Sequence, residues 1–169
     1  SGIADVIRKL DKKGFSREEI ALKVIDNVIE SDFQGEETAE QCIRTSLAIL
    51  TEGVVAAPLE GIAKVKIKSN FDGTSYLAIF FAGPIRSAGG TAAALVVLLG
   101  DYIRQKLHLD VFKISEDETE RYIEEMELYN RITRLQYFPT PDETRTALTH
   151  IPVEITGEPT EKQEVSGYR

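Results

Sequence analysis

Hydrophobic positions recur every three or four residues through the first sixty residues, which is the spacing of amphipathic helices. The first set ends at Gly14, and the second opens with a capping box formed by Ser16 and Glu19. A third set runs from about Glu37 to Thr51. Short connections favour antiparallel packing, so residues 1–60 are predicted to form a helical subdomain of three short helices.

Residues 62–81 change from helical to alternating hydrophobicity, which predicts two β-strands. Asp72-Gly73 lies between the two strands and is a hairpin turn signal. The second strand, residues 76–81, is apolar on both faces and is therefore expected to be central in a sheet. The first strand places three basic side chains on the face opposite its apolar one: Lys64, Lys66 and Lys68.

Helices are predicted to dominate the chain after this hairpin. An uninterrupted apolar helix is expected over residues 91–109, buried against the sheet, and a second helix over residues 116–135 opens with a capping box of Ser115 and Glu118. The inner side of the second helix is expected to carry four apolar residues: Ile123, Met126, Ile132 and Leu135. Two tyrosines of this helix are interpreted as packing residues rather than as stacking platforms for bases: Tyr122 and Tyr129.

A short helix that begins at Thr140 and a strand over residues 153–156 complete the pattern, followed by a polar tail from Gly157. The predicted fold class is α+β, predominantly helical. N-terminal helices precede a small antiparallel sheet, made of the hairpin and the later strand, which packs on long helices. Residues 1–60 and 61–169 are the two expected subdomains. The chain begins Ser1-Gly2 without methionine and is expected to be a segment of a longer subunit.

Net charge is −8 over 169 residues, which argues against a globally basic nucleic-acid binder. The charge is unevenly distributed, because residues 61–114 carry seven basic and three acidic groups and the flanking regions are acidic. The single cysteine, Cys42, falls in an apolar helical pattern and predicts a buried structural thiol in a reducing, cytoplasmic setting. No apolar run reaches membrane-spanning length, so no membrane partner is expected.

The basic third contains a glycine-rich turn from Gly83 to Thr91 that leads into a helix, and such a turn is a candidate anion site. It lacks the spacing of a P-loop or of a dinucleotide fingerprint, and its glycines could equally serve tight packing. The lysines could likewise serve only solubility or edge protection. Together the two features predict a phosphate or nucleic-acid contact made by eight residues: Lys64, Lys66, Lys68, Arg86, Ser87, Gly89, Gly90 and Thr91.

Catalytic chemistry is not apparent in the sequence. The basic third offers only isolated acids at positions 72, 101 and 110, and two-metal catalysis requires clustered carboxylates. His108 and His150 are far apart, so neither a zinc site nor a triad with Cys42 can be assembled. The chain alone is predicted to have no catalytic residue, no metal site and no cofactor.

Three runs of residues resemble one known family: Phe81 to Ala92 (FAGPIRSAGGTA), Glu120 to Tyr129 (ERYIEEMELY) and Ile151 to Thr160 (IPVEITGEPT). They are similar to the N-terminal region of the large subunit of archaeal family D DNA polymerase. The resemblance is specific from about Ala82 to Arg169, and the first sixty residues are compatible with it.

The resemblance implies a parent protein that is a replicative DNA polymerase with a magnesium-dependent nucleotidyl-transfer site in its large subunit. A small subunit would supply 3′ to 5′ exonuclease activity. The family's catalytic carboxylates belong further along the large subunit, and none is carried over here. The chain is therefore expected to be a non-catalytic module for subunit assembly and DNA contact. Its expected partners are DNA, the remainder of the large subunit, the small exonuclease subunit and a second copy of itself. Two alternatives remain open: a small-molecule phosphate or nucleotide site at Gly83–Thr91, and a purely structural spacer.

Overall fold

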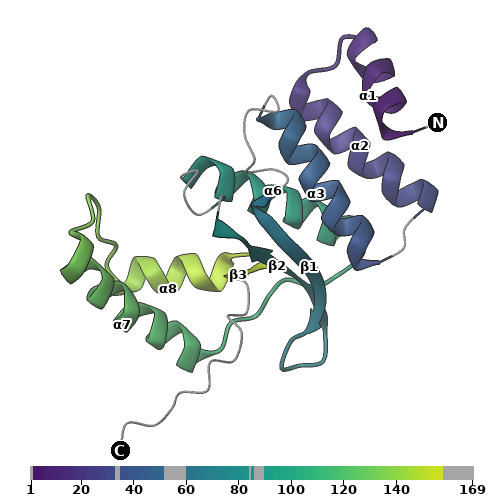
Figure 1. Cartoon of the computed structure of the whole chain (residues 1–169). Helices are drawn as coiled ribbons and strands as arrows, with labels where there is room; N and C mark the ends of the chain where they lie inside the picture. The colour runs from purple at the N-terminus through teal and green to yellow at the C-terminus, as the bar shows by residue number, and fades with distance from the viewer. Residues whose placement is uncertain (1, 33–34, 52–59, 84, 86–89, 158–169) are drawn as a thin grey trace, which may run out of the picture.

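The computed structural model describes residues 2–32, 35–51, 60–83, 85 and 90–157 of the chain. The described elements are, in order, α1 (Ile3–Lys12), α2 (Arg17–Asp32), α3 (Glu36–Leu50), β1 (Ile62–Ser69), β2 (Ser75–Phe81), α6 (Gly90–Lys106), α7 (Glu116–Thr133), α8 (Pro141–His150) and β3 (Glu154–Gly157). The N-terminal helices and the α7–α8 pair extend from opposite sides of a small sheet (Figure 1). The predicted fold class, α+β and mostly helical, is confirmed.

The three N-terminal helices begin and end close to the predicted positions. At the start of α2, Ser16 N–H donates to Glu19 Oε2 (2.8 Å) and Glu19 N–H donates to Ser16 Oγ (3.2 Å), so the predicted capping box is present. Helices α2 and α3 pack against each other, and Cys42 is buried in the hydrophobic core to which both helices contribute. The predicted buried thiol is confirmed, and its burial raises the pKa of Cys42 to about 11. The core continues from these helices into the sheet, across the boundary predicted at residue 60, and that boundary stays a prediction.

The sheet has the order β1-β2-β3, with β2 central as predicted. Strands β1 and β2 form the predicted antiparallel hairpin, and Gly73 in its turn has a φ of +84°, which glycine adopts without steric strain. Strand β3 instead runs parallel to β2, with Ile155 opposite Ile79. The prediction of an antiparallel sheet is wrong for this strand, and the sheet is mixed. The chain between β2 and β3 includes α6, α7 and α8, and a crossover of this length can return the chain in the same direction.

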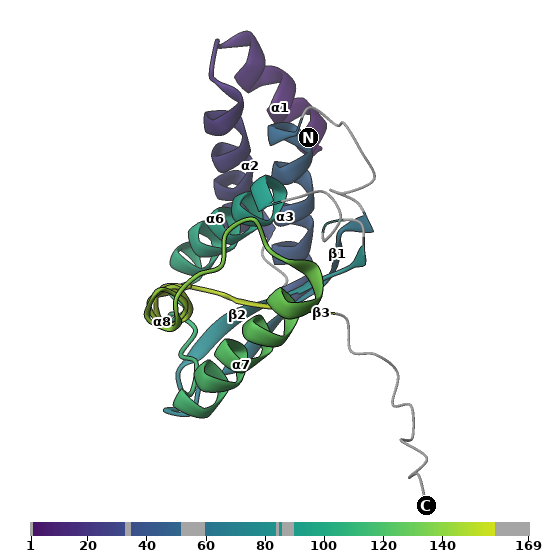
Figure 2. The same ribbon diagram turned by 90° about the vertical axis from the view of Figure 1, so that its left-hand side faces the viewer.

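Helix α6 packs closely on β2, on the face of the sheet opposite the lysines. A Cβ atom added at Gly100 would lie 2.6 Å from Ile79 Cδ1, so the glycine allows the helix backbone to approach the strand. Figure 2 shows α6 beside α2 and α3 and close to β2. The predicted burial is confirmed for one side of the helix, whereas Leu98 on the other side is 59% exposed. The helix ends at Lys106, about one turn earlier than predicted.

Helices α7 and α8 form an antiparallel arm. The predicted helix start at Thr140 is present as α8, where Thr140 and Glu143 form a capping box, and Arg145 of α8 donates to both carboxylate oxygens of Glu120 in α7 (2.7 and 2.9 Å). The predicted inner side of α7 is only partly correct, because Ile132 is 83% exposed. Among the described residues, that part of α7 has no element packed over it. The other three predicted inner residues are buried or half-buried: Ile123, Met126 and Leu135.

The close approach at Gly100 generates a stability prediction. We expect Gly100→Ala to lower the free energy of unfolding by about 1 kcal/mol, because overpacking costs about 1–3 kcal/mol and improved helix propensity offsets about 1 kcal/mol. Chemical denaturation would measure this change. Adding Ile79→Val removes the clashing methyl group, so the double variant should be more stable than the sum of the two single changes predicts.

Gly90→Ala provides the matched control, since a Cβ at Gly90 meets no heavy atom within 4 Å. This variant should be as stable as the parent or slightly more stable. Equal stability changes at both glycines, with no coupling to Ile79, would contradict the packing account.

Candidate nucleic-acid interface

The predicted site residues are divided between two places. Lys64, Lys66 and Lys68 lie on β1, opposite Phe80, Ala78 and Tyr76 of β2. Since Ile79 points towards α6, these alternate residues point to the other face of the sheet, which we call the lysine face. The remaining described site residues, Gly90 and Thr91, are exposed at the start of α6. The other predicted members lie outside the described residues: Arg86, Ser87 and Gly89.

Lys64 is the member of the lysine face that has no ion pair among the described residues. Its Nζ atom lies 5.2 Å from the centre of the Phe80 ring, where the negative face of the ring favours a cation. In the described part of the chain, no carboxylate forms an ion pair with Lys64. An anion approaching the lysine face can therefore pair with this ammonium group without displacing a carboxylate.

Lys66 is held by a carboxylate from the N-terminal end of α3. Its Nζ donates to Glu36 Oε2 (2.6 Å), and the backbone N–H of Ile67 donates to Glu36 Oε1 (2.8 Å). These hydrogen bonds lower the pKa of Glu36 and raise that of Lys66. Because Ile67 N–H lies on the outer edge of β1, Glu36 also protects an edge strand from pairing with another chain.

Lys68 is held by a carboxylate from β3. Its Nζ donates to Glu154 Oε2 (2.7 Å), which also accepts from the Tyr76 hydroxyl (2.9 Å). Burial disfavours the charged lysine, but the hydrogen bond and the charge of Glu154 outweigh it and raise the pKa of Lys68. Burial and the same carboxylate also raise the pKa of Tyr76.

Sequence reasoning missed both of these acidic partners. Glu36 lies 30 positions before Lys66, and Glu154 lies 86 positions after Lys68, so no local pattern could reveal the pairs. They reduce the three lysine charges to a net charge near +1 among the described groups of this face. The available positive potential is therefore smaller than the lysine spacing alone implies.

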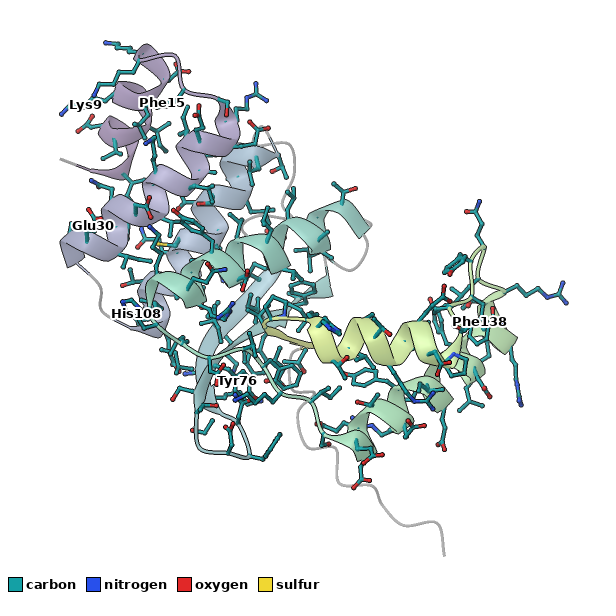
Figure 3. The ribbon with its side chains drawn as sticks, turned by 180° about the vertical axis from the view of Figure 1, so that it is seen from behind. Lys9, Phe15, Glu30, Tyr76, His108 and Phe138 are labelled. Carbon is teal, nitrogen blue, oxygen red and sulfur yellow. The ribbon has the colours of Figure 1, made fainter. Side chains whose placement is uncertain are left out.

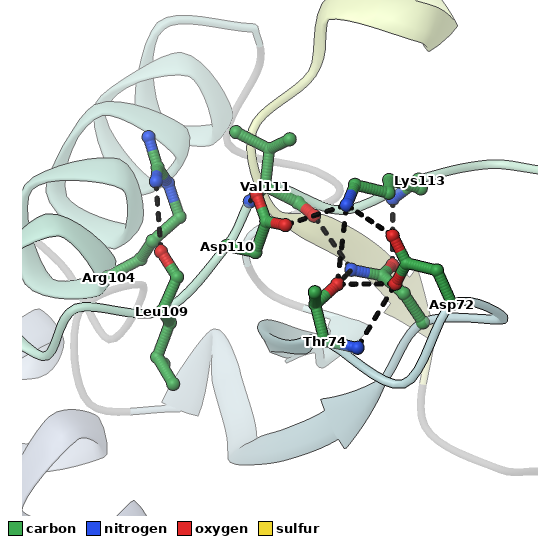
Figure 4. Close-up of polar contacts among 8 residues, drawn as sticks. Asp72, Thr74, Arg104, Leu109, Asp110, Val111 and Lys113 are labelled. Atoms are coloured by element: carbon green, nitrogen blue, oxygen red, sulfur yellow. Dashed lines mark hydrogen bonds and ion pairs between the residues drawn. The ribbon is translucent and has the colours of Figure 1, made fainter.

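A second polar network joins the hairpin turn to the segment that leads into α7 (Figure 4). Lys113 Nζ donates to Asp72 Oδ2 and to Asp110 Oδ2, each at 2.6 Å. Asn70 Nδ2 donates to the Val111 carbonyl (2.9 Å), and Lys113 N–H donates to Asn70 Oδ1 (2.9 Å). The base of the arm is thereby fixed to the sheet.

Lys113 shifts the titration of both carboxyl groups in this network. Its hydrogen bonds hold the pKa values of Asp72 and Asp110 below their usual range, with further hydrogen bonds from Thr74 to Asp72 and from Val111 N–H to Asp110. Both carboxylates are occupied by the protein's own donors. The network is accordingly structural, and it does not present a free acidic pair to a metal ion.

The described residues contain no group of three or more His, Cys, Asp or Glu side chains placed to hold a metal ion. Within the same described ranges, no helix combines the length and the apolar character needed to cross a bilayer.

The comparisons with known proteins agree on one class of protein. A family model described as "DNA polymerase II large subunit DP2, N-terminal" matches residues 1–169. Relatives called DNA polymerase II large subunit include those of Thermococcus kodakarensis (58% identical, 98% of this chain and 10% of the relative), Methanosphaera stadtmanae (58%, 97% and 16%) and Pyrococcus furiosus (56%, 98% and 14%).

All three relatives are large subunits of a DNA polymerase. The chain belongs to the N-terminal family of the DNA polymerase II large subunit DP2. It spans between 10% and 16% of the length of these relatives.

The Lys113 network predicts an acid-sensitive contribution to stability. A carboxyl group whose pKa is lower in the folded than in the unfolded state stabilises the fold at pH values above its unfolded-state pKa, which is about 3.9 for Asp. This stabilisation is lost as the pH falls towards the pKa of the folded state. We expect Asp72→Asn combined with Asp110→Asn to lower the melting temperature at pH 7. The difference from the parent should shrink as the pH is lowered from about 5 towards 2.

Asp11→Asn in α1, outside the network, is the control and should follow the parent at every pH. A melting-temperature difference for the double variant that stays constant across this pH range would contradict the assigned role of Lys113.

Proposed function

We propose that this chain is a non-catalytic module of a replicative archaeal polymerase of family D, which contributes to subunit assembly and contacts DNA through the lysine face. Family membership and the resemblance of the Phe81–Ala92, Glu120–Tyr129 and Ile151–Thr160 runs support the proposal. For the whole protein, the same proposal includes polymerase activity, its magnesium requirement, the exonuclease subunit, self-association and a cytoplasmic location.

The observation that carries DNA contact is the position of the lysines on the sheet. Among the described elements, α6 packs on the face of the sheet opposite the lysines, and α3 packs along β1. On the lysine face, Tyr76 and Ala78 of β2 are buried, so the exposed part of this face lies along the outer strand β1. The side chains of Lys66 and Lys68 are 46% and 42% exposed. Exposed ion pairs stabilise a fold only weakly, so phosphate oxygens can replace Glu36 and Glu154 at small cost.

The engagement of the acids in the basic third supports the non-catalytic part of the proposal. Asp101 pairs with Arg104 on its own helix (2.6 Å), and Asp72 and Asp110 pair with Lys113. None of these described carboxylates converges with another around open space, which catalysis by two metal ions requires.

The lysine face predicts opposite effects for two sets of substitutions. Replacing Lys64, Lys66 and Lys68 with Gln should weaken binding of duplex DNA and reduce the slope of log affinity against log salt by roughly 0.9 for each phosphate that is no longer neutralised. Glu36→Gln combined with Glu154→Gln frees two of these lysines and should strengthen binding. Glutamine retains an oxygen that can accept from Ile67 N–H, so the edge of β1 stays protected.

Fluorescence anisotropy with one duplex at several salt concentrations measures both effects, with melting temperature as the folding control. Unchanged affinity and slope in both variants would remove the lysine face from the DNA-contact proposal. Thermal stabilisation by nucleotides that disappears in Thr91→Val would instead favour the phosphate site at Gly83–Thr91. No effect of either ligand would favour a structural spacer.

A further inference from the structure

The tip of the α7–α8 arm, residues 128–141, is basic, whereas the first part of α7 is acidic. Residues 116–127 carry seven acidic groups and one arginine, whereas residues 128–141 carry Arg131 and Arg134 and no acidic group. The tip lies at the far end of the arm from the sheet. Figure 3 shows Phe138 there, on the opposite side of the molecule from Lys9 of α1.

Neither guanidinium group of the tip is neutralised by the described residues. Arg131 and Arg134 are exposed, and within the described chain neither side chain has an ion pair or a hydrogen bond. The other arginines of the arm differ in this respect. Arg121 pairs with Glu125 (3.5 Å), and Arg145 pairs with Glu120 (2.7 Å). The guanidinium groups of Arg131 and Arg134 are therefore available to phosphate oxygens.

Several large apolar residues lie near these two arginines along the chain. Ile132 is 83% exposed and Tyr137 is 68% exposed, which is far more than packing within the arm would leave. The complete set of exposed large apolar residues at the tip is Leu128, Tyr129, Ile132, Tyr137 and Phe138. Exposed apolar residues gathered in one short segment are typical of an interaction site. The sequence pattern predicts packing roles for Tyr122 and Tyr129. Both lie at the surface, 37% and 54% exposed, so neither is a core residue.

The turn that presents these rings is held by the arm's own hydrogen bonds. Arg134 closes α7 in the left-handed conformation (φ +50°), and Leu135 N–H donates to Asn130 Oδ1 (3.0 Å). The Tyr137 hydroxyl donates to Glu143 Oε1 (2.7 Å), so the ring is anchored at one end and exposed over its face. A surface fixed in this way gives up little conformational entropy when a ligand binds.

We propose that the arm tip is a binding site for single-stranded DNA. Exposed tyrosine and phenylalanine rings stack on unpaired bases, and arginines beside them pair with the backbone phosphates. Duplex DNA hides the faces of its bases, so the rings select single strands. The inference rests on the proposed function, that this chain contacts DNA, but uses a surface separate from the lysine face.

Fluorescence anisotropy with a labelled oligothymidylate, alongside a duplex of equal length, tests the site. Arg131→Gln with Arg134→Gln should weaken single-strand binding and lower its log–log salt slope by roughly 0.7 for each phosphate left without its arginine. Tyr137→Leu with Phe138→Leu keeps apolar side chains but removes both rings, and should weaken single-strand binding at least about fivefold. Tyr137→Phe keeps the ring and should bind within about twofold of the parent.

Lys9→Gln with Lys12→Gln is the charge-matched control, because it removes two positive charges at the far end of the molecule. It should leave the single-strand salt slope unchanged, and melting temperatures should show that every variant folds.

Unchanged single-strand affinity and slope in both tip variants would overturn the proposal. If those variants instead failed to associate with the remainder of a large subunit, the tip would be a protein interface, which also overturns it. The proposed function fails separately, when the lysine-face variants leave duplex binding unchanged.

Discussion

The packing of α6 on β2 at Gly100 determines how the described parts of this chain are arranged. A Cβ at this position would lie 2.6 Å from Ile79 Cδ1, so the absence of a side chain lets the helix approach the sheet closely. This close approach gathers the apolar faces of α2, α3 and α6 over one face of a single sheet. The three lysines of β1 lie on the other face, and the candidate DNA contact lies there.

Electrostatics on the lysine face depend on tertiary structure more than on composition. An acidic chain can approach DNA only through a local surface of positive potential. Here, Glu36 and Glu154 bring carboxylates to that surface while they protect or connect strand edges. Lys66 and Lys68 are paired with these carboxylates, whereas Lys64 has no ion pair among the described residues. If this face contacts DNA, Lys64 is therefore the lysine that a phosphate would meet without displacing a described carboxylate.

Local signals in the sequence suffice for much of the fold. The capping boxes at Ser16 and Thr140 and the turn at Gly73 are predictable because each depends on residues within a few positions of one another. The predicted direction of β3 is wrong because strand direction depends on the path of the intervening chain, which includes α6, α7 and α8. Ile132 is misplaced on an inner face because helical periodicity cannot tell whether another element packs over that face.

The candidate site is predictable only in part for the same reason. Alternation along β1 places three lysines on one face, and the observed register agrees with this. The acids that pair with two of them come from α3 and β3, so only the folded chain brings the groups together. The basic and aromatic character of the arm tip is present in the sequence, but its exposure follows from the absence of a packing partner among the described elements.

Nuclear magnetic resonance provides the most direct test of the central claim that the lysine face is a DNA contact. Duplex DNA would be titrated into the isotopically labelled chain while the side-chain signals of Lys64, Lys66 and Lys68 and the ring of Phe80 are followed. The account predicts that these signals shift together and that added salt reverses the shifts. Shifts confined to α1 and α2, with the lysine face unaffected, would contradict it.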